Sequence, residues 1–212
     1  MPTKIIPLVI FATLLATFAC NRLSTVEKTN DLGFRTVYTV DPKTEMKEGE
    51  MQQFDADGNL LEMANYKADQ LDGIRVIFGD SGDTSIVETY AAGEFAGSYR
   101  TYYPGGEQVK LSGQYVNNTM SGLWLKYHPN GQLAEEVTFA GNEENGPFRE
   151  WFENGQLAAE GSYLNGDNEQ GRLRVYNEDG SLNRVMDCDN GVCRSVWRDT
   201  YDTPPPARQL PN

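Results

Sequence analysis

The stretch GLWLKYHPNGQLAEE (residues 122–136) decides the fold, because its glycine and aromatic positions recur along the chain with a fixed period. Glycines equivalent to its first residue are spaced 24 or 25 residues apart: Gly49, Gly73, Gly97, Gly122, Gly146 and Gly171. A second glycine follows each of these after nine residues: Gly58, Gly82, Gly106, Gly131, Gly155 and Gly180. An aromatic residue follows each after five residues: Phe54, Phe78, Tyr102, Tyr127, Trp151 and Tyr176. This common register establishes six tandem repeats.

The second glycine of each repeat marks a hairpin turn. It closes dipeptides such as Asn130-Gly131 and Asp179-Gly180, which tolerate the positive φ of tight β-turns. Each repeat is therefore a strand, a turn and a return strand, and most return strands end near an aromatic residue: Tyr66, Tyr90, Tyr115, Phe139 and Tyr163. Glycine at every turn argues against helices. We expect an all-β fold, namely an elongated, twisted antiparallel sheet of six tandem β-hairpin repeats.

Two apolar positions within the repeat bear on which face of the sheet is exposed. The second position (Trp124, Phe148) and the fifth (Tyr127, Trp151) would face opposite sides of a flat strand, which predicts twisting and bulges. If the fifth-position aromatics pack inward, the other side presents five candidate partner-binding residues: Tyr99, Tyr103, Trp124, Phe148 and Phe152. Exposed aromatic residues concentrate binding energy. The alternative is that the twist of the sheet or the N-terminal segment covers this face.

Residues 122–136 and 146–160 resemble the bacterial MORN-repeat variant, whose unit reads G-x-W-x-x-Y-x-x-N-G-x-L-x-x-E. The resemblance covers residues 49 to about 187 and is weakest in the second repeat, where Arg75 replaces the apolar residue and Thr84 the leucine. Proteins built from this unit are often described as YwqK-family antitoxins. The resemblance implies an elongated antiparallel sheet that binds other proteins or, in some MORN proteins, membranes.

The N-terminus has the pattern of an export signal that ends in a lipidation site. Lys4 precedes an apolar stretch from Ile5 to Phe18, and Ala19 and Cys20 follow. The end of this segment resembles the lipobox of bacterial lipoproteins, so we expect residues 1–19 to be a signal peptide and Cys20 to carry the lipid. The alternatives are a plain secretory signal and an uncleaved anchor, although a membrane span needs roughly 20 apolar residues.

The expected organisation continues from this signal. We expect residues 20–33 to be a polar tether and residues 34–48 to add an N-terminal cap strand. Residues 49–198 form the six-repeat β domain, and residues 199–212 form a disordered, proline-rich tail. Cys188 occupies the aromatic slot of the last hairpin, and a four-residue loop separates it from Cys193. A disulfide between these two residues is expected, consistent with export, and a metal site is the alternative.

Composition and motifs disfavour several classes of function. The net charge is −13, and no run of Lys or Arg offers the basic face that nucleic acids need. The single histidine, His128, lies at a turn position and lacks the partners of a catalytic or metal site. Residues 55–59 resemble a calcium loop only in part, and the many carboxylates are expected to form a solvated stripe. We expect no enzyme activity, no cofactor and no metal.

Two hypotheses follow from these patterns. The first is a non-enzymatic lipoprotein of the bacterial cell envelope that presents its repeat sheet to an unknown protein partner or to a glycan. Asn21 rather than Asp follows Cys20, which favours an outer-membrane destination by resemblance to a lipoprotein sorting rule. The second hypothesis is an antitoxin or immunity-type protein, whose acidic surface would suit a basic toxin acting in the envelope.

Overall fold

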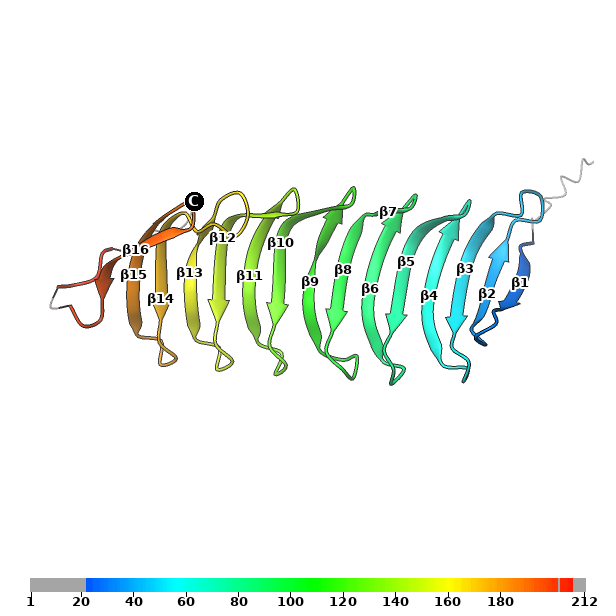
Figure 1. Ribbon diagram of the computed structural model, residues 1–212, viewed down its shortest axis with the longest axis horizontal. Coiled ribbons are helices and arrows are strands. Elements are labelled where there is room, and N and C mark those ends of the chain that lie inside the picture. Colours follow the sequence, from blue (N-terminus) through cyan, green and yellow to red (C-terminus); the bar gives the residue numbers. More distant parts are fainter. Residues whose placement is uncertain (1–21, 202, 208–212) are drawn as a thin grey trace, which may run out of the picture.

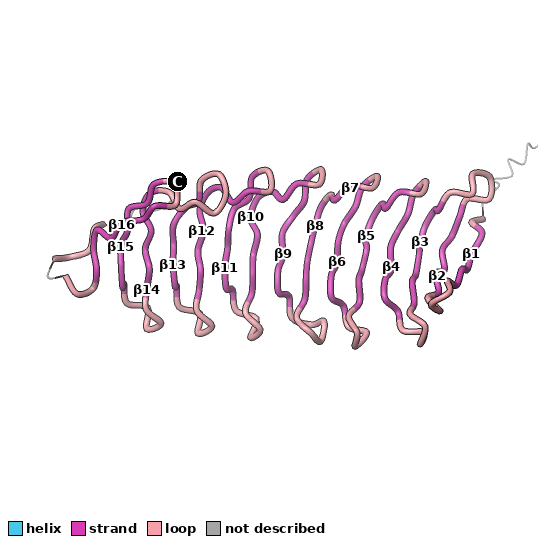
Figure 2. Tube along the Cα trace, in the orientation of Figure 1, coloured by secondary structure: helices cyan, strands magenta, loops and turns pink. Residues whose placement is uncertain are grey.

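A computed structural model describes residues 22–201 and 203–207 of the chain, and this part is a single open antiparallel sheet without helices (Figures 1 and 2). Its sixteen strands are β1 (Ser24–Thr29), β2 (Arg35–Val40), β3 (Lys47–Phe54), β4 (Leu60–Lys67), β5 (Gln70–Phe78), β6 (Thr84–Ala91), β7 (Glu94–Phe95), β8 (Gly97–Tyr102), β9 (Val109–Val116), β10 (Thr119–Tyr127), β11 (Leu133–Ala140), β12 (Glu143–Trp151), β13 (Leu157–Tyr163), β14 (Gly171–Tyr176), β15 (Leu182–Asp189) and β16 (Val192–Arg198). Neighbours in sequence are neighbours in the sheet, except that the short β7 pairs only with β6. The predicted all-β architecture is confirmed.

Each predicted repeat is one hairpin of this sheet. The six hairpins are β3–β4, β5–β6, β8–β9, β10–β11, β12–β13 and β14–β15. Every one of them shifts register between the fourth and fifth positions of the repeat, as between Glu150 and Trp151. These irregularities are the bulges that the sequence predicted. They bend each strand close to its turn, and the sheet remains one layer thick along its length (Figure 1).

The segments that flank the repeats are more ordered than expected. The tether predicted for residues 20–33 is wrong for Ser24–Thr29, which form β1 and pair in full with β2. Part of the predicted tail contacts the sheet: the Trp197 indole donates to the carbonyl oxygen of Thr203, and the Arg174 guanidinium donates to that of Pro206. The expected signal peptide and Cys20 lie outside the described residues.

Hydrogen bonds join consecutive hairpins at both long edges of the sheet, where the strands end. At one edge, most repeats are joined by two-residue turns, whereas seven residues connect β13 to β14. In one of the two-residue turns Ala92 and Gly93 have φ of 49° and 85°, and the Gly93 amide donates to the Leu71 carbonyl of the preceding hairpin. At the other edge, the Asn130 and Asn154 side chains donate to backbone carbonyl oxygens one repeat further on, at 2.8 Å in each case. These bonds couple each repeat to the next, as stability in a repeat array requires.

His128 makes a contact of the same kind between consecutive hairpins. Its Nε2 lies 2.8 Å from the Trp151 carbonyl oxygen, and one repeat earlier the Tyr103 hydroxyl donates to the Tyr127 carbonyl oxygen at the same distance. The two side chains occupy equivalent positions and make equivalent bonds. The histidine therefore has a structural contact in the described protein. No helix in the described part of the chain is long and apolar enough to cross a membrane.

Candidate binding groove on the aromatic face

One face of the sheet carries the core of the protein, and we call it the aromatic face. Its central row follows the cross-strand register, in which Trp124 pairs with Val137, Val137 with Phe148, and Phe148 with Gly161. The second positions of the repeats thus alternate with residues of the return strands, most of which are small or of moderate size. The central row on the forward strands is Met51, Arg75, Tyr99, Trp124, Phe148 and Leu173, and on the return strands Ala64, Glu88, Gly113, Val137, Gly161 and Met186.

The large side chains are buried because they lie across the small ones. Trp124 is 2% exposed and Phe148 3% exposed. A Cβ at Gly113 would overlap the indole ring of Trp124, and a Cβ at Gly161 would lie 2.8 Å from a ring carbon of Phe148. The missing side chains therefore make the space that the rings fill. In a one-layer sheet, this lateral packing takes the place of a second layer.

Aromatic residues at the ends of the return strands complete this cover. Tyr115 meets Trp124 edge to face with ring centroids 5.3 Å apart, and Trp124 meets Phe139 at 5.8 Å. Tyr163 stacks on Phe148 at 4.1 Å. Each such residue pairs with the first glycine of its own repeat, as Tyr163 does with Gly146, whose φ of 119° favours glycine. A Cβ at Gly146 would meet Thr138 and not the Tyr163 ring, so the backbone conformation and not the ring accounts for the glycine.

The five candidate partner-binding residues were expected to be exposed if the fifth-position aromatics packed inward, and the alternative was that their face is covered. Trp124 and Phe148 are the buried centre of the aromatic face, so these two residues are not exposed. Tyr99 packs half-buried against the same cluster. One fifth-position aromatic, Tyr176, donates its hydroxyl hydrogen to Glu160 on the opposite face. The physical reason is position: second-position side chains lie mid-strand between two neighbours, and fifth-position side chains lie beside a turn.

The disulfide expected at the last hairpin is present, and it ends the aromatic face. Cys188 pairs directly with Cys193 of β16, and the two sulfur atoms are bonded. Cys188 is buried in the cluster that contains Phe148 and Leu173. It pairs with Gly171, as the return-strand aromatics pair with the first glycines of earlier repeats. The bridge thus stands in the place of a ring at the end of the array.

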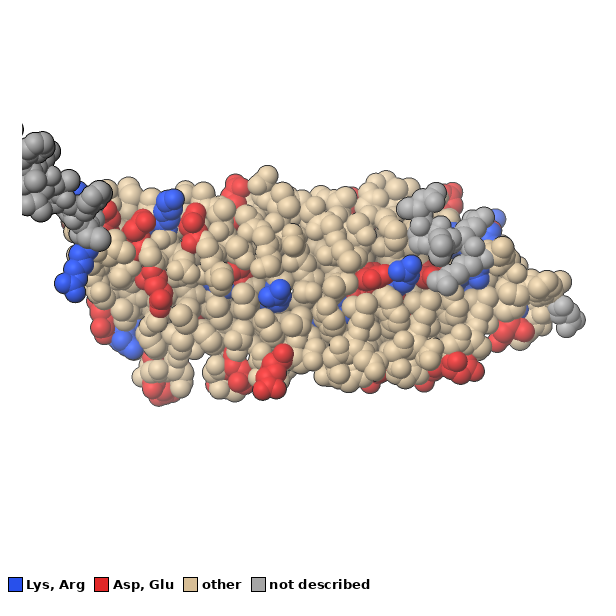
Figure 3. Space-filling view, turned by 180° about the vertical axis from the view of Figure 1, so that it is seen from behind, with Lys and Arg blue, Asp and Glu red and all other residues tan. Residues whose placement is uncertain are grey.

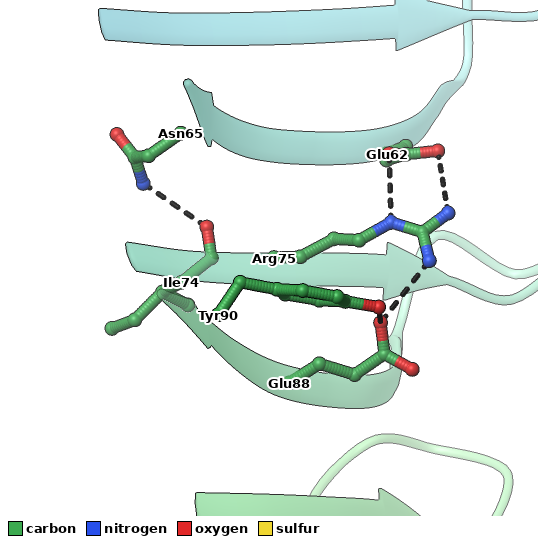
Figure 4. A network of polar contacts seen from close by, with 6 residues as sticks. All are labelled: Glu62, Asn65, Ile74, Arg75, Glu88 and Tyr90. Atoms are coloured by element: carbon green, nitrogen blue, oxygen red, sulfur yellow. Dashed lines mark hydrogen bonds and ion pairs between the residues drawn. The ribbon is translucent and has the colours of Figure 1, made fainter. Parts of the chain in front are cut away.

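The second repeat interrupts the apolar row with a buried ionic cluster (Figure 4). Arg75 donates to both oxygens of Glu62, at 2.8 and 3.1 Å, and to Glu88 at 3.1 Å. The Tyr90 hydroxyl donates to the same Glu88 oxygen at 3.0 Å. Burial, with the adjacent Glu88 carboxylate, raises the pKa of Tyr90 to about 12. Each buried charge here has a partner, as burial of charge requires.

The opposite face of the sheet also pairs its partly buried charges. Arg149 bonds to Glu136 at 2.8 Å and lies 3.9 Å from Glu160, which is buried. Seen from behind the view of Figure 1, the acidic and basic side chains are scattered over the surface and do not gather in one basic patch (Figure 3).

A groove of about 190 Å³ opens on the aromatic face over β9–β12. Its lining residues are Leu111, Met120, Trp124, Lys126, Glu135, Val137, Phe139 and Glu144. A second hollow adjoins it towards the turns, shares Lys126 and Glu135, and adds Glu150 together with two predicted partner-binding residues, Tyr103 and Phe152. We call the two hollows together the acidic groove. Trp124, Tyr103 and Phe152 therefore line one feature, although Trp124 does so as part of the core.

The carboxylates of the acidic groove are poorly neutralised. Glu135 and Glu150 lie directly opposite each other on β11 and β12, and Lys126 is 3.7 Å from Glu135. Burial, and then the negative charge of Glu135, raise the pKa of Glu150 above its ordinary value. The same two causes, in the same order, raise the pKa of Glu144. Neither Glu144 nor Glu150 has an ion pair within the described residues.

The groove also contains a polar atom without a partner. The Trp124 indole Nε1 is buried and donates no hydrogen bond within the described protein. Sequence reasoning identified Trp124, Tyr103 and Phe152 but not Glu144 and Glu150, which it assigned to a solvated stripe. The expected pairing of adjacent strands could have placed Glu135 opposite Glu150 and so indicated two carboxylates close together. Among the described residues, no three His, Cys, Asp or Glu side chains are placed to hold a metal ion.

The fold and the groove define a class of protein, an open β-repeat scaffold whose main aromatic cluster is buried on one face. Three segments of the chain match the family described as MORN repeat variant, over residues 47–68, 120–140 and 144–165. They correspond to the first, fourth and fifth hairpins, in which the repeat sequence is most regular. A comparison with curated proteins gave no match.

Proposed function

We propose that the protein is a non-enzymatic binding scaffold of the bacterial cell envelope, anchored through a lipid on Cys20, that presents its acidic groove to a protein partner. The observation that carries this proposal is the set of three half-buried carboxylates with a single lysine among them, placed beside aromatic side chains on the strands of the repeat sheet. Sites on regular strands hold their side chains more firmly than sites on loops. The three MORN repeat variant segments support a repeat scaffold of the kind that binds other molecules.

The position of β1 limits how far the sheet can lie from a lipid on Cys20. Only residues 21–23 separate Cys20 from the first strand, which begins at Ser24. Four residue steps span at most roughly 14 Å of extended chain. A lipid on Cys20 would therefore hold the N-terminal end of the sheet close to the membrane surface, and the repeats would carry the groove away from that end.

The anchoring is tested with a Cys20→Ala variant expressed in a bacterium with labelled palmitate. Loss of label and release of the protein from the membrane fraction are expected, because two or more acyl chains are needed for stable anchoring. Cys188→Ala with Cys193→Ala is the matched control, since these cysteines form the disulfide and should leave the label unchanged. An unlabelled wild-type protein, or a Cys20→Ala variant that stays in the membrane, would contradict the lipoprotein assignment.

The binding part is tested by crosslinking in the native envelope followed by purification of the tagged protein. Tyr103→Ala with Phe152→Ala should reduce capture of the specific partner, because both side chains line the acidic groove away from the buried core. Tyr201→Ala, at an exposed aromatic residue beyond β16, is the control. Equal capture by all three proteins would show that the partner binds elsewhere on the sheet.

An antitoxin or immunity function is the second candidate. The observation in its favour is the net charge of −13, which complements a basic toxin. Export would restrict such a toxin to the envelope. The function is tested by expressing the protein together with a genetically adjacent toxin candidate directed to the envelope. Protection of growth that is lost with Tyr103→Ala and Phe152→Ala would favour this function over a housekeeping scaffold.

A further inference from the structure

We infer that the acidic groove binds a lysine or arginine side chain presented by an extended segment of the protein partner. The inference rests on the proposed function and names the chemistry that its binding site recognises. Three features of the described residues carry it. They are an excess of negative charge in the groove, the indole N–H of Trp124 without an acceptor, and the like charges of Glu135 and Glu150 directly opposite each other.

The charge of the groove differs from that of other acidic positions on the sheet. Glu62 and Glu88 share Arg75, and on the opposite face Glu136 bonds to Arg149. In the acidic groove, by contrast, Glu135, Glu144 and Glu150 have one lysine among them, at 3.7 Å from Glu135. The two hollows therefore carry more negative than positive charge. Glu144 lines one hollow and Glu150 the other, so basic side chains of a ligand would supply to each what Arg75 supplies to the second repeat.

The Trp124 indole provides an independent indication of a ligand. Buried polar groups in folded proteins nearly always have a hydrogen-bond partner, and Nε1 of Trp124 has none among the described residues. The groove that it lines is otherwise bounded by carboxylates, a lysine and apolar side chains. Because Nε1 is buried, a ligand acceptor reaches it only when the indole ring shifts. A ligand that carries both a cation and a hydrogen-bond acceptor would then satisfy both parts of the site. A peptide meets this requirement, because every residue of its backbone has a carbonyl group.

The third feature is the placement of like charges. Glu135 and Glu150 are directly opposed on adjacent strands, an arrangement that destabilises a sheet. Local rules that a folded protein breaks without an internal compensation point to functional positions. The apolar members of the lining, Met120 and Phe139, would contact the aliphatic stem of a lysine or arginine while its charged end lies between carboxylates. The shape and the charge of the hollow thus fit the same side chain.

The inference is tested with an N-acetylated, C-amidated heptapeptide of alternating alanine and arginine, titrated by calorimetry into the folded protein. Binding is expected to weaken at least tenfold in Glu144→Gln with Glu150→Gln. The matched control is Glu153→Gln with Glu178→Gln, which makes the same charge change at two exposed turn residues and should leave the affinity within twofold. Circular dichroism confirms that all variants remain folded.

Nuclear magnetic resonance supplies a second measurement. The chain has three tryptophans, so Trp151→Phe and Trp197→Phe identify the Trp124 indole N–H signal by elimination. This signal should shift with the arginine peptide. Equal weakening in both pairs of Gln variants would show non-specific attraction and overturn the inference, as would a stationary indole signal. Spermidine binding as tightly as the peptide would assign the groove to polyamines and overturn it too.

The outcome also separates this inference from the proposed function. If the envelope partner is captured equally by the wild type and by Glu144→Gln with Glu150→Gln, the scaffold function stands and the cation-binding groove is wrong. If the arginine peptide binds as described but no envelope protein is captured, the groove is correct and the proposed partner-binding function is wrong.

Discussion

The indole ring of Trp124 lies over Gly113 of the neighbouring strand, and it occupies the space that any side chain at position 113 would take. Tyr99 pairs with Gly113 on the other side, so the glycine sits between two aromatic residues. The ring and the missing side chain form one unit of packing. A related unit forms at Phe148 and Gly161, where the ring lies over the return strand of its own hairpin.

Gly113→Ala should therefore destabilise the protein. The added Cβ overlaps the indole ring, and overpacking of this kind costs about 1–3 kcal/mol. Urea unfolding followed by circular dichroism measures the loss. Trp124→Leu in the Gly113→Ala background should recover part of it, because the smaller side chain makes room, whereas Trp124→Leu alone is destabilising. Additive effects of the two substitutions would contradict the close packing described here.

Much of the fold could be predicted from the sequence, because glycine at fixed intervals constrains the backbone directly. The six hairpins, the bulges and the disulfide all follow from the spacing of turn and aromatic residues. The identity of the buried face could not be read from the aromatic residues alone, since both faces carry them. Gly113 and Gly161 held the missing information: small residues in a return strand mark the neighbours that large rings cover.

The flanking segments show a different limit. Ser24–Thr29 was expected to be a tether because it is polar, yet it contains Thr25 and Val26, which favour strands, and it meets a ready edge at β2. The availability of that edge is a property of the folded sheet and is not visible in the local sequence. The unpaired state of Glu144 and Glu150 was equally out of reach, because it depends on which cations the fold places nearby.

The side-chain hydrogen bonds between consecutive repeats are expected to contribute to the free energy of unfolding. Asn154→Asp keeps the oxygen that accepts the Gln156 amide but removes the donor to the Glu178 carbonyl, so a loss of about 1 kcal/mol in the free energy of unfolding is expected. Asn117→Asp adds the same charge at an exposed turn where no side-chain bond reaches the next repeat. That control should stay within about 0.5 kcal/mol of the wild type by thermal unfolding.

The ionic cluster of the second repeat predicts a large effect on stability. Arg75→Met leaves Glu62 and the buried Glu88 without their cation. Breaking a buried pair costs about 3–5 kcal/mol, and the partial exposure of Arg75 places the expected loss near the lower end of that range. Urea unfolding at neutral pH measures the loss.

A triple variant provides the control for this cluster. Arg75→Met combined with Glu62→Gln and Glu88→Gln removes the charges together, so most of the lost stability should return. Tyr90 offers a local readout, because burial and the Glu88 carboxylate raise its pKa to about 12, while Arg75 lowers it by a smaller amount. The triple variant removes both charges, and the Glu88 effect is the larger, so titration of Tyr90 should give a lower pKa than in the wild type.

The acidic groove should make the protein less stable at neutral pH than it would be without those charges. Burial and the charge of Glu135 raise the pKa of Glu144 and Glu150 in the folded state, so the folded protein binds protons that the unfolded chain releases. Stability from these groups is therefore present at acidic pH and is lost as the pH rises through the raised pKa values. Glu144→Gln with Glu150→Gln should raise the thermal midpoint at pH 7, and the gain should vanish towards pH 4. The control is Glu153→Gln with Glu178→Gln, which makes the same charge change at exposed turn residues. If Glu144→Gln with Glu150→Gln changes the thermal midpoint at pH 7 no more than this control does, the carboxylates of the groove do not destabilise the folded protein.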